Sequence, residues 1–266
     1  MDSNPTKPYK IGVALSGGGA RGFAHVGVLK ALEEAGLKPD VISGVSSGSV
    51  VAVMYAAGIG FDDMLKAFTK AKFLDFAEIK MSKGGFFSIE KFKKHILKVI
   101  GKEYQNLEDL NIPTYLGLTD LDHGVAVDLN EGPIGETMVA SCSIPIVFQP
   151  VTINGVRYVD GGVLRNLPAS VLRDKCELLI GVNCSPLEHE HNFKSSFLDV
   201  GIRTYGLVTK IYQSRDIQIC DLSISIDDIS SYKAFNLKQI REVYLRGYST
   251  ARKILRDKGY LSSSHS

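Results

Sequence analysis

The sequence predicts an α/β fold, a three-layer sandwich in which helices cover both faces of a mainly parallel central sheet. Two observations support this prediction. Apolar segments at 9–15 and 41–45 are typical of short buried strands, and each is followed by a helical segment, at 20–35 and 50–57. A strand–helix–strand–helix order is typical of parallel sheets with right-handed crossovers.

Glycines mark the ends of these first elements. The run Ser16-Gly17-Gly18-Gly19 interrupts the first strand, and Gly36 supplies a stop after the first helix, whose apolar residues recur at helical spacing. Small residues follow the second strand and lead directly into the second helix. The start of the chain therefore contains two strand-to-helix junctions close together.

The rest of the chain continues with mixed elements. Two amphipathic helices are predicted at 61–69 and 88–100. Asn154-Gly155 is the strongest short signal for a β-hairpin, here between strands 151–153 and 156–159. The other predicted elements are strands at 113–121, 125–129, 178–183 and 222–226, and helices at 197–215 and 237–257.

The sequence contains no internal repeat and no linker long enough to divide it. We therefore predict one domain over residues 1–266, with a core at about 9–186. Residues 187–257 are expected to form a helical and strand-containing C-terminal part of the same domain. The polar end, 258–266, is expected to be a disordered tail.

Composition excludes several classes of protein. The chain has 31 basic and 29 acidic residues, and a net charge of +2 argues against a nucleic-acid partner. No secretory signal is visible, and no segment reaches the roughly 18 apolar residues of a membrane span. The four cysteines lack metal-binding spacing, which favours reduced thiols. We expect a cytoplasmic protein, with peripheral membrane contact left open because apolar surface can bind an interface. The oligomeric state is not indicated.

One pentapeptide could carry a catalytic serine. Gly44-Val45-Ser46-Ser47-Gly48 has the GxSxG pattern and lies between a predicted strand and a predicted helix. A nucleophilic serine needs this setting, because it sits on a sharp turn that small neighbours allow. The alternative is that Ser46 only caps the following helix. The context favours the nucleophile.

The glycine-rich segment Ser16–Gly22 has two interpretations. Its glycines satisfy the GxGxxG fingerprint of a dinucleotide site, but the acidic residue expected at the end of the second strand is missing. We therefore interpret the loop as an oxyanion site, in which Gly17, Gly18 and Gly19 donate backbone N–H groups. Arg21 could orient this loop or attract an anionic head group, or it could form a surface ion pair.

A serine nucleophile needs a base, which is usually a histidine. His25 lies among apolar neighbours and is more simply structural. Only His189 and His191 follow a strand end in the manner of an α/β-hydrolase.

Asp160 is the other candidate for the base. It directly follows a predicted strand and precedes Gly161 and Gly162, which allow close backbone contact. A buried carboxylate beside a serine could accept the hydroxyl proton during attack. The alternative is that Asp160 only begins a turn, as Asp-Gly often does.

Three segments together resemble the patatin-like phospholipase family, particularly its bacterial members. They are SGGGARG (Ser16–Gly22), GVSSG (Gly44–Gly48) and DGG (Asp160–Gly162). The segment 140–145, ASCSIP, is also similar to the stretch that precedes the aspartate in that family. The resemblance runs over about residues 9–170.

This resemblance implies a Ser–Asp dyad. It implies Ser46 as nucleophile within the Gly44 and Gly48 elbow, and Asp160 as base beside Gly161 and Gly162. It places Gly17 to Gly19 with Arg21 in the oxyanion region. The implied reaction is hydrolysis of phospholipid or lysophospholipid acyl esters through an acyl-serine, without metal or cofactor. Two alternatives remain: a lipid acyltransferase that uses the same acyl-serine, and a non-catalytic nucleotide- or phosphate-binding protein.

Overall fold

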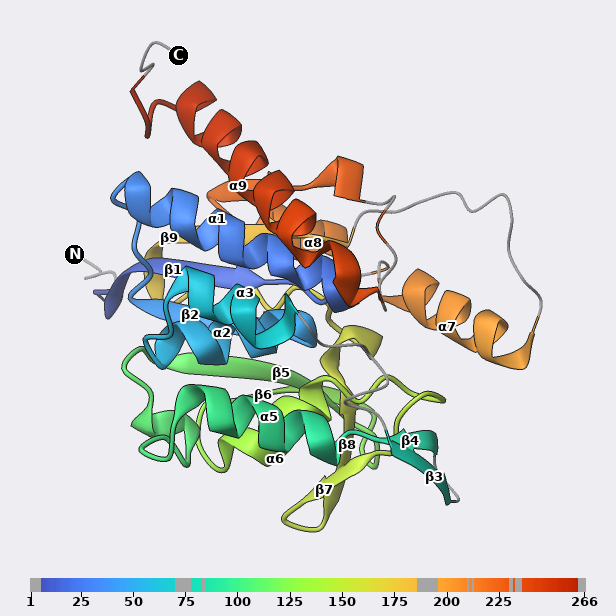
Figure 1. Cartoon of the computed structure of the whole chain (residues 1–266). Helices are drawn as coiled ribbons and strands as arrows, with labels where there is room; N and C mark the ends of the chain where they lie inside the picture. The colour runs from blue at the N-terminus through green and yellow to red at the C-terminus, as the bar shows by residue number, and fades with distance from the viewer. Residues whose placement is uncertain are drawn as a thin grey trace.

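The computed structural model describes residues 6–69, 78–82, 85–185, 196–209, 211, 213–229, 232 and 236–262. Figure 1 shows a central sheet with helices packed on its faces, so the predicted α/β sandwich is confirmed. Alternate residues of the first strand enter two separate apolar clusters, because successive strand residues point to opposite faces. Val13 and Leu15 join one cluster, and Ala14 joins the other.

The central sheet is mainly parallel. Its order is β10-β9-β1-β2-β5-β8-β7, and β6 also pairs with β5. The five strands from β10 to β5 run parallel, whereas β6, β7 and β8 add antiparallel pairs. The strands are β1 (Tyr9–Leu15), β2 (Val41–Val45), β5 (Thr114–Asp120), β6 (Val125–Leu129), β7 (Val151–Ile153), β8 (Val156–Asp160), β9 (Cys176–Asn183) and β10 (Leu222–Ser225).

Helices surround this sheet, and a small two-stranded sheet of β3 (Glu78–Ser82) and β4 (Gly85–Ser88) lies outside it. The α-helices are α1 (Phe23–Glu34), α2 (Ser47–Ala56), α3 (Phe61–Thr69), α5 (Glu90–Ile100), α6 (Ile134–Ser141), α7 (Phe197–Val208), α8 (Gln213–Gln218) and α9 (Ile240–Asp257). Short 3-10 turns include η1 (Gly19–Gly22) and η3 (Gly161–Val163).

Two helical features differ from the sequence-based expectation. The helix predicted at 197–215 is divided into α7 and α8, and the Thr209 hydroxyl after α7 donates to the Gly206 carbonyl at 2.9 Å. Such a side-chain bond competes with continued helix geometry. The second difference is α6, which the sequence did not predict because it is short and contains Gly135 and the β-branched Thr137.

The C-terminal part packs directly on the N-terminal part. Figure 1 shows α9 lying along α1, and two glycines allow the contact. A Cβ atom on Gly27 would lie 2.2 Å from the Tyr244 carbonyl oxygen, and one on Gly247 would lie 2.2 Å from that of Ala24. Buried residues of both helices share one apolar cluster. This common core supports the prediction of one domain. Of the predicted tail, residues 263–266 lie outside the described residues.

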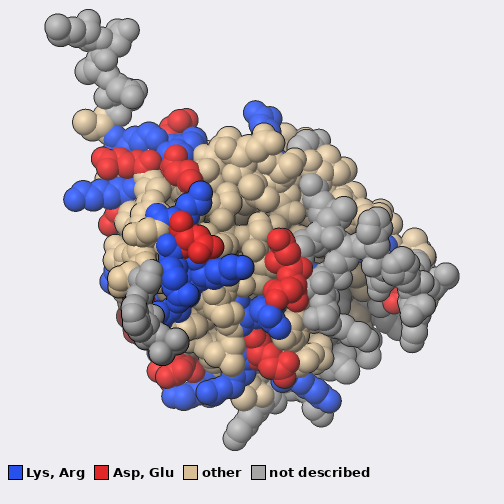
Figure 2. Space-filling view, turned by 90° about the horizontal axis from the view of Figure 1, so that it is seen from above, with Lys and Arg blue, Asp and Glu red and all other residues tan. Residues whose placement is uncertain are grey.

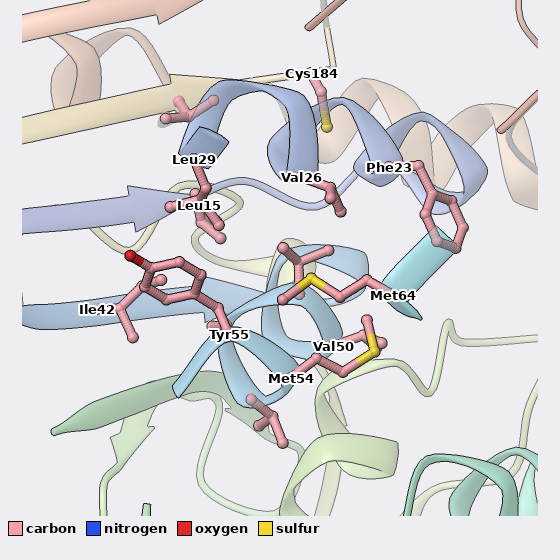
Figure 3. Packing of buried hydrophobic residues seen from close by; sticks show 14 of the residues in the cluster. Leu15, Phe23, Val26, Leu29, Ile42, Val50, Met54, Tyr55, Met64 and Cys184 are labelled. Carbon is pink, nitrogen blue, oxygen red and sulfur yellow. The ribbon is translucent and has the colours of Figure 1, made fainter. Parts of the chain in front are cut away.

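The main apolar cluster fills the space between the first strands and helices. Figure 3 shows Leu15 of β1, Leu29 of α1, Ile42 of β2 and Met54 of α2 among the residues of this cluster. All four side chains are fully buried. This packing fixes the position of α2, and hence of the strand-to-helix turn at its start.

Strand β5 brings the two other predicted site segments together. Its residues 116–120 all pair with β6 along one edge, so β2 and β8 share the opposite edge in succession. Val45 at the end of β2 pairs with Gly117, and Asp160 at the end of β8 pairs with Leu118. Ser46 and Asp160 therefore lie close together, at the point along β5 where pairing with β2 ends and pairing with β8 begins.

The described surface carries mixed charge. On the face seen in Figure 2, Lys and Arg side chains are interspersed with Asp and Glu. Ion pairs such as Arg252 with Glu34 and Arg246 with Asp228 join α9 to its surroundings. Within the described ranges, no helix combines the length and apolar character needed to span a bilayer.

Candidate active site

Ser46 occupies a strained turn between β2 and α2. Its φ of 53° and ψ of −124° are unusual for a residue with a side chain. Its carbonyl accepts from the Ser49 N–H at 2.9 Å and so begins the helix, but its side chain makes no capping hydrogen bond. The residue is 7% exposed. The hydroxyl is therefore not used as a cap.

The two glycines of the pentapeptide make this sharp turn possible. A Cβ atom on Gly44 would lie 2.4 Å from the Gly48 carbonyl oxygen, and one on Gly48 would lie 2.4 Å from that of Leu15. Each contact is with backbone, which cannot move aside as a flexible side chain can. The turn thus requires glycine at both positions, as the sequence predicts.

Ser141 at the end of α6 fixes the Ser46 backbone. The Ser46 N–H donates to Ser141 Oγ at 3.0 Å, and that hydroxyl donates to the Gly117 carbonyl at 2.8 Å. Both groups are buried. The segment 140–145, noted in the sequence only for its resemblance, thereby connects the serine turn to β5.

The same segment also holds Asp160. The Ser143 carbonyl accepts the Asp160 N–H at 3.0 Å, and Thr119 Oγ1 donates to the Asp160 carbonyl at 3.1 Å. Close packing explains the glycine that follows, because a Cβ on Gly161 would lie 2.4 Å from the Gly117 carbonyl oxygen. The backbone of Asp160 is thus fixed from two sides.

The Asp160 carboxylate is fully buried. Its Oδ1 accepts from the Gly162 N–H at 2.8 Å, so Asp160 does form the turn suggested by the Asp-Gly pair. Its Oδ2 has no regular hydrogen bond within the described residues. Burial raises the pKa of Asp160 to about 6, against the opposing effects of the Gly162 N–H and of the Ser46 and Tyr205 hydroxyls. Oδ1 therefore fixes the turn, and Oδ2 is available to accept a hydrogen bond from the Ser46 hydroxyl.

The glycine-rich loop lies beside the serine. A Cβ on Gly17 would lie 3.2 Å from Ser46 Cβ. The Gly17 N–H, however, donates to the Asn166 carbonyl at 3.0 Å and is not free for an oxyanion. Among the described residues, no hydrogen bond uses the N–H of Gly18 or Gly19. This finding narrows the predicted oxyanion donors to Gly18 and Gly19.

Arg21 lies in η1, directly after the glycine run. A Cβ on Gly18 would lie 2.7 Å from Cys184 Sγ and 3.7 Å from Arg21 Cβ, so Gly18 packs against both residues. Burial raises the pKa of the Cys184 thiol to about 11, and the positive charge of Arg21 partly opposes this shift. This position favours the interpretation that Arg21 orients the loop.

No histidine that the structure describes contacts Ser46. His25 is buried with its Nε2 2.8 Å from the Ser16 carbonyl oxygen, and burial lowers its pKa to about 4. His95 contacts the Ala67 carbonyl and His123 contacts Asp120. His189 and His191 lie outside the described residues.

Two further side chains reach the site that the sequence analysis missed. A Cβ on Gly162 would lie 2.5 Å from Tyr205 Oη and 3.0 Å from Asn166 Oδ1. Asn166 follows Asp160 closely in sequence, and its position in the same loop is a signal that could have been used. Tyr205 comes from α7, and no local pattern indicates it. Within the described residues, no cluster of three or more His, Cys, Asp or Glu could hold a metal ion.

The chain is similar in sequence to known proteins. Residues 13–173 match the family described as patatin-like phospholipase. An uncharacterized NTE family protein of Mycobacterium tuberculosis is 31% identical over 217 residues, which cover 78% of this chain and 60% of the relative. A lysophospholipase NTE1 of Coccidioides immitis is 30% identical over 172 residues, covering 61% of this chain and 11% of the relative. The chain thus spans less than two thirds of each of these relatives.

A solved structure shares the fold. VipD from Legionella pneumophila aligns with a TM-score of 0.53 at 15% sequence identity, covering 94% of this chain and 67% of VipD. The alignment includes nearly the whole chain, beyond the residues matched by the family.

Proposed function

Because this chain belongs to the patatin-like phospholipase family, we propose that it hydrolyses acyl ester bonds of phospholipids or lysophospholipids. Relatives named as lysophospholipases support this substrate class. The observation on which the proposal chiefly rests is the meeting of Ser46, on its strained turn, with the buried carboxylate of Asp160.

The first half of the reaction forms an acyl-serine. Ser46 Oγ attacks the ester carbonyl carbon while its proton passes to Asp160. The negative charge that develops on the carbonyl oxygen is stabilised by the free N–H groups of Gly18 and Gly19, each worth about 3–4 kcal/mol in well-organised oxyanion sites. The intermediate collapses, and the leaving alcohol takes the proton from Asp160.

The second half releases the fatty acid. Asp160, again ionised, accepts a proton from a water molecule that attacks the acyl carbon. Collapse of the second tetrahedral intermediate breaks the bond to Ser46, whose oxygen recovers the proton from Asp160. The cycle needs only one base because the same carboxylate serves both halves. A pKa of about 6 suits this use, since the group is ionised near neutral pH and still accepts a proton readily.

Hydrolysis of p-nitrophenyl butyrate and lysophosphatidylcholine tests this proposal. Ser46→Ala should abolish activity, and Asp160→Asn should lower kcat by about 10²–10⁴-fold, with melting temperatures not reduced. Ser47→Ala is a matched control, because the adjacent hydroxyl makes no hydrogen bond among the described residues. Wild-type activity in Asp160→Asn would exclude the Ser–Asp dyad, and an inactive wild type would exclude the hydrolase.

The proposal includes contact with a lipid surface. Exposed apolar side chains lie on and beside α7: Val200 is 46% exposed, Leu207 is 48% exposed and Ile211 is 63% exposed. The seven-residue spacing of Val200 and Leu207 puts them on one face of the helix, while Tyr205 points toward Asp160. A lipid surface on that face would lie across α7 from Asp160.

Vesicle binding tests this contact. Leu207→Asp should weaken sedimentation with phosphatidylcholine vesicles and activity on them, and leave hydrolysis of soluble p-nitrophenyl butyrate unchanged. Leu245→Asp is the control, because Leu245 is 51% exposed on α9. Equal effects of both substitutions, or none, would contradict the proposal.

A further inference from the structure

Helix α7 brings a side chain to the dyad from outside the family-matched region. That region ends at residue 173, and Tyr205 lies beyond it. The Tyr205 hydroxyl lies against Gly162, within 2.5 Å of the position a Cβ would occupy there. The same position is 3.1 Å from Asp160 Oδ1. The phenol thus reaches the residue whose N–H shapes the Asp160 turn.

Helix α7 packs on Ile146, which directly follows the segment 140–145 that also holds Asp160. A Cβ on Gly201 would lie 2.8 Å from Ile146 Cδ1, so α7 and Ile146 are in close contact at this point. Ile146 has a φ of 73°, an unusual conformation for a β-branched residue. It lies three residues after Ser143, whose carbonyl accepts the Asp160 N–H. The position of Tyr205 is therefore linked to that of Asp160 through the backbone.

The groups that face the carboxylate are few. The Gly162 N–H donates to it, and the nearby Ser46 and Tyr205 hydroxyls lower its pKa. The titratable groups that face it among the described residues are Tyr205 from α7 and Cys142 after α6. Burial raises the pKa of both above its ordinary value, so both stay neutral where Asp160 titrates.

We propose that Tyr205 is a positioning residue for the dyad, whose hydroxyl donates to the Asp160 carboxylate and holds it in the orientation that faces Ser46. This inference rests on the proposed function. A donor at the carboxylate stabilises its ionised form, so Tyr205 keeps Asp160 able to accept a proton at lower pH than burial alone would allow.

The pH dependence of Ser46 labelling by a fluorophosphonate tests this role without turnover. In Tyr205→Phe, the acidic limb of the labelling rate should move to higher pH by about 0.5–1 unit. Labelling at pH 6 should then fall about twofold to fivefold, with a smaller loss at pH 8. Tyr55→Phe is the control, because it removes a similar phenol–carboxylate bond, 2.6 Å to Glu33, away from the dyad. Tyr55→Phe should leave the pH of the acidic limb of the labelling rate unchanged. An unmoved limb in Tyr205→Phe would overturn the inference.

A second measurement separates failure of this inference from failure of the proposed function. If Ser46 is neither labelled nor active, the proposed function is wrong. Asp160→Asn should raise the free energy of unfolding whether or not the protein is a hydrolase. The size of this increase reports on the Asp160 pKa, because it grows with pH until the carboxylate of the folded protein is ionised. In the Tyr205→Phe background the gain should level off at higher pH than in the wild-type background. The same levelling pH in both backgrounds would contradict the role of Tyr205.

Discussion

Asp160 combines two tasks in one side chain. Its Oδ1 caps the turn at Gly162, which fixes the carboxylate, and its burial raises the pKa to about 6. An exposed aspartate, with a pKa near 4, would be ionised but a weaker base. In the proposed mechanism, burial makes Asp160 a stronger base for Ser46, at the expense of a buried charge with no ionic partner among the described residues.

The raised pKa of Asp160 predicts the acidic limb of the activity profile. Asp160 must be ionised to accept the Ser46 proton, so kcat/KM should rise with pH and reach half its plateau near pH 6. Initial rates on p-nitrophenyl butyrate between pH 4.5 and 8.5 measure this midpoint. A midpoint near 4 would indicate an unperturbed carboxylate and contradict the burial of Asp160.

The same burial predicts a stability gain on removing the charge. The folded pKa lies above the unfolded value of about 3.8, so folding loses free energy as pH rises from about 4 to 6. Two pKa units correspond to an upper limit of about 3 kcal/mol. Asp160→Asn should therefore raise the free energy of unfolding at pH 7, measured by urea denaturation, and have little effect at pH 4.

A surface aspartate gives the opposite control. Hydrogen bonds from Arg157 lower the pKa of Asp122, so Asp122→Asn should reduce stability at pH 7. Loss of stability in Asp160→Asn, comparable to that in Asp122→Asn, would contradict the unfavourable burial of the Asp160 charge.

At the scale of elements, β5 explains how the site is assembled. The sequence predicted both that one strand ends at Ser46 and that another ends at Asp160. It could not predict that these strands follow each other along one edge of β5, at Gly117 and Leu118. Strand pairing depends on long-range packing, whereas the motifs are local. The family resemblance supplied the link that local patterns lacked.

Ser141 is expected to hold the Ser46 backbone in a fixed position relative to β5. Ser141→Ala removes both the acceptor for the Ser46 N–H and the donor to Gly117. Two buried groups lose their partners, at a cost of about 1–3 kcal/mol each, and the serine turn loosens. We expect kcat on p-nitrophenyl butyrate to fall about tenfold or more, a loss of about 1.4 kcal/mol in transition-state stabilisation.

Ser143→Ala is the matched control for this prediction. The Ser143 hydroxyl donates to the Val139 carbonyl at 2.7 Å, and it is the Ser143 carbonyl, which alanine keeps, that holds Asp160. Ser143→Ala should lower the melting temperature with little change in kcat. Equal kcat for both variants would show that Ser141 has no particular role.

At the scale of the whole molecule, the N-terminal and C-terminal parts both contribute residues to the candidate site. The motifs lie within residues 16–162, and the sequence located them. The sequence did not indicate that α7, far along the chain, would bring Tyr205 to Asp160, because nothing local distinguishes this tyrosine. The division of the predicted 197–215 helix has a similar origin, since side-chain bonds such as that of Thr209 depend on the folded geometry.

The contact of α9 with α1 predicts a single cooperative unfolding transition. Both helices contribute to one apolar cluster, so neither part should unfold alone. Far-ultraviolet circular dichroism and tyrosine fluorescence should give coincident urea curves. Gly247→Ala, which forces a Cβ against the Ala24 carbonyl, should lower the midpoint of both curves together. Two separated transitions would contradict the single domain.

The central claim is that Ser46 carries the acyl group and that Asp160 activates the Ser46 hydroxyl as its base. Rapid acid quenching during turnover of a p-nitrophenyl ester, followed by peptide mass spectrometry, tests it most directly. We predict that the wild type carries one acyl group on the peptide containing Ser46, and that Asp160→Asn forms this adduct at least about 10²-fold more slowly. An adduct on another residue, or an equally fast adduct in Asp160→Asn, would contradict the account.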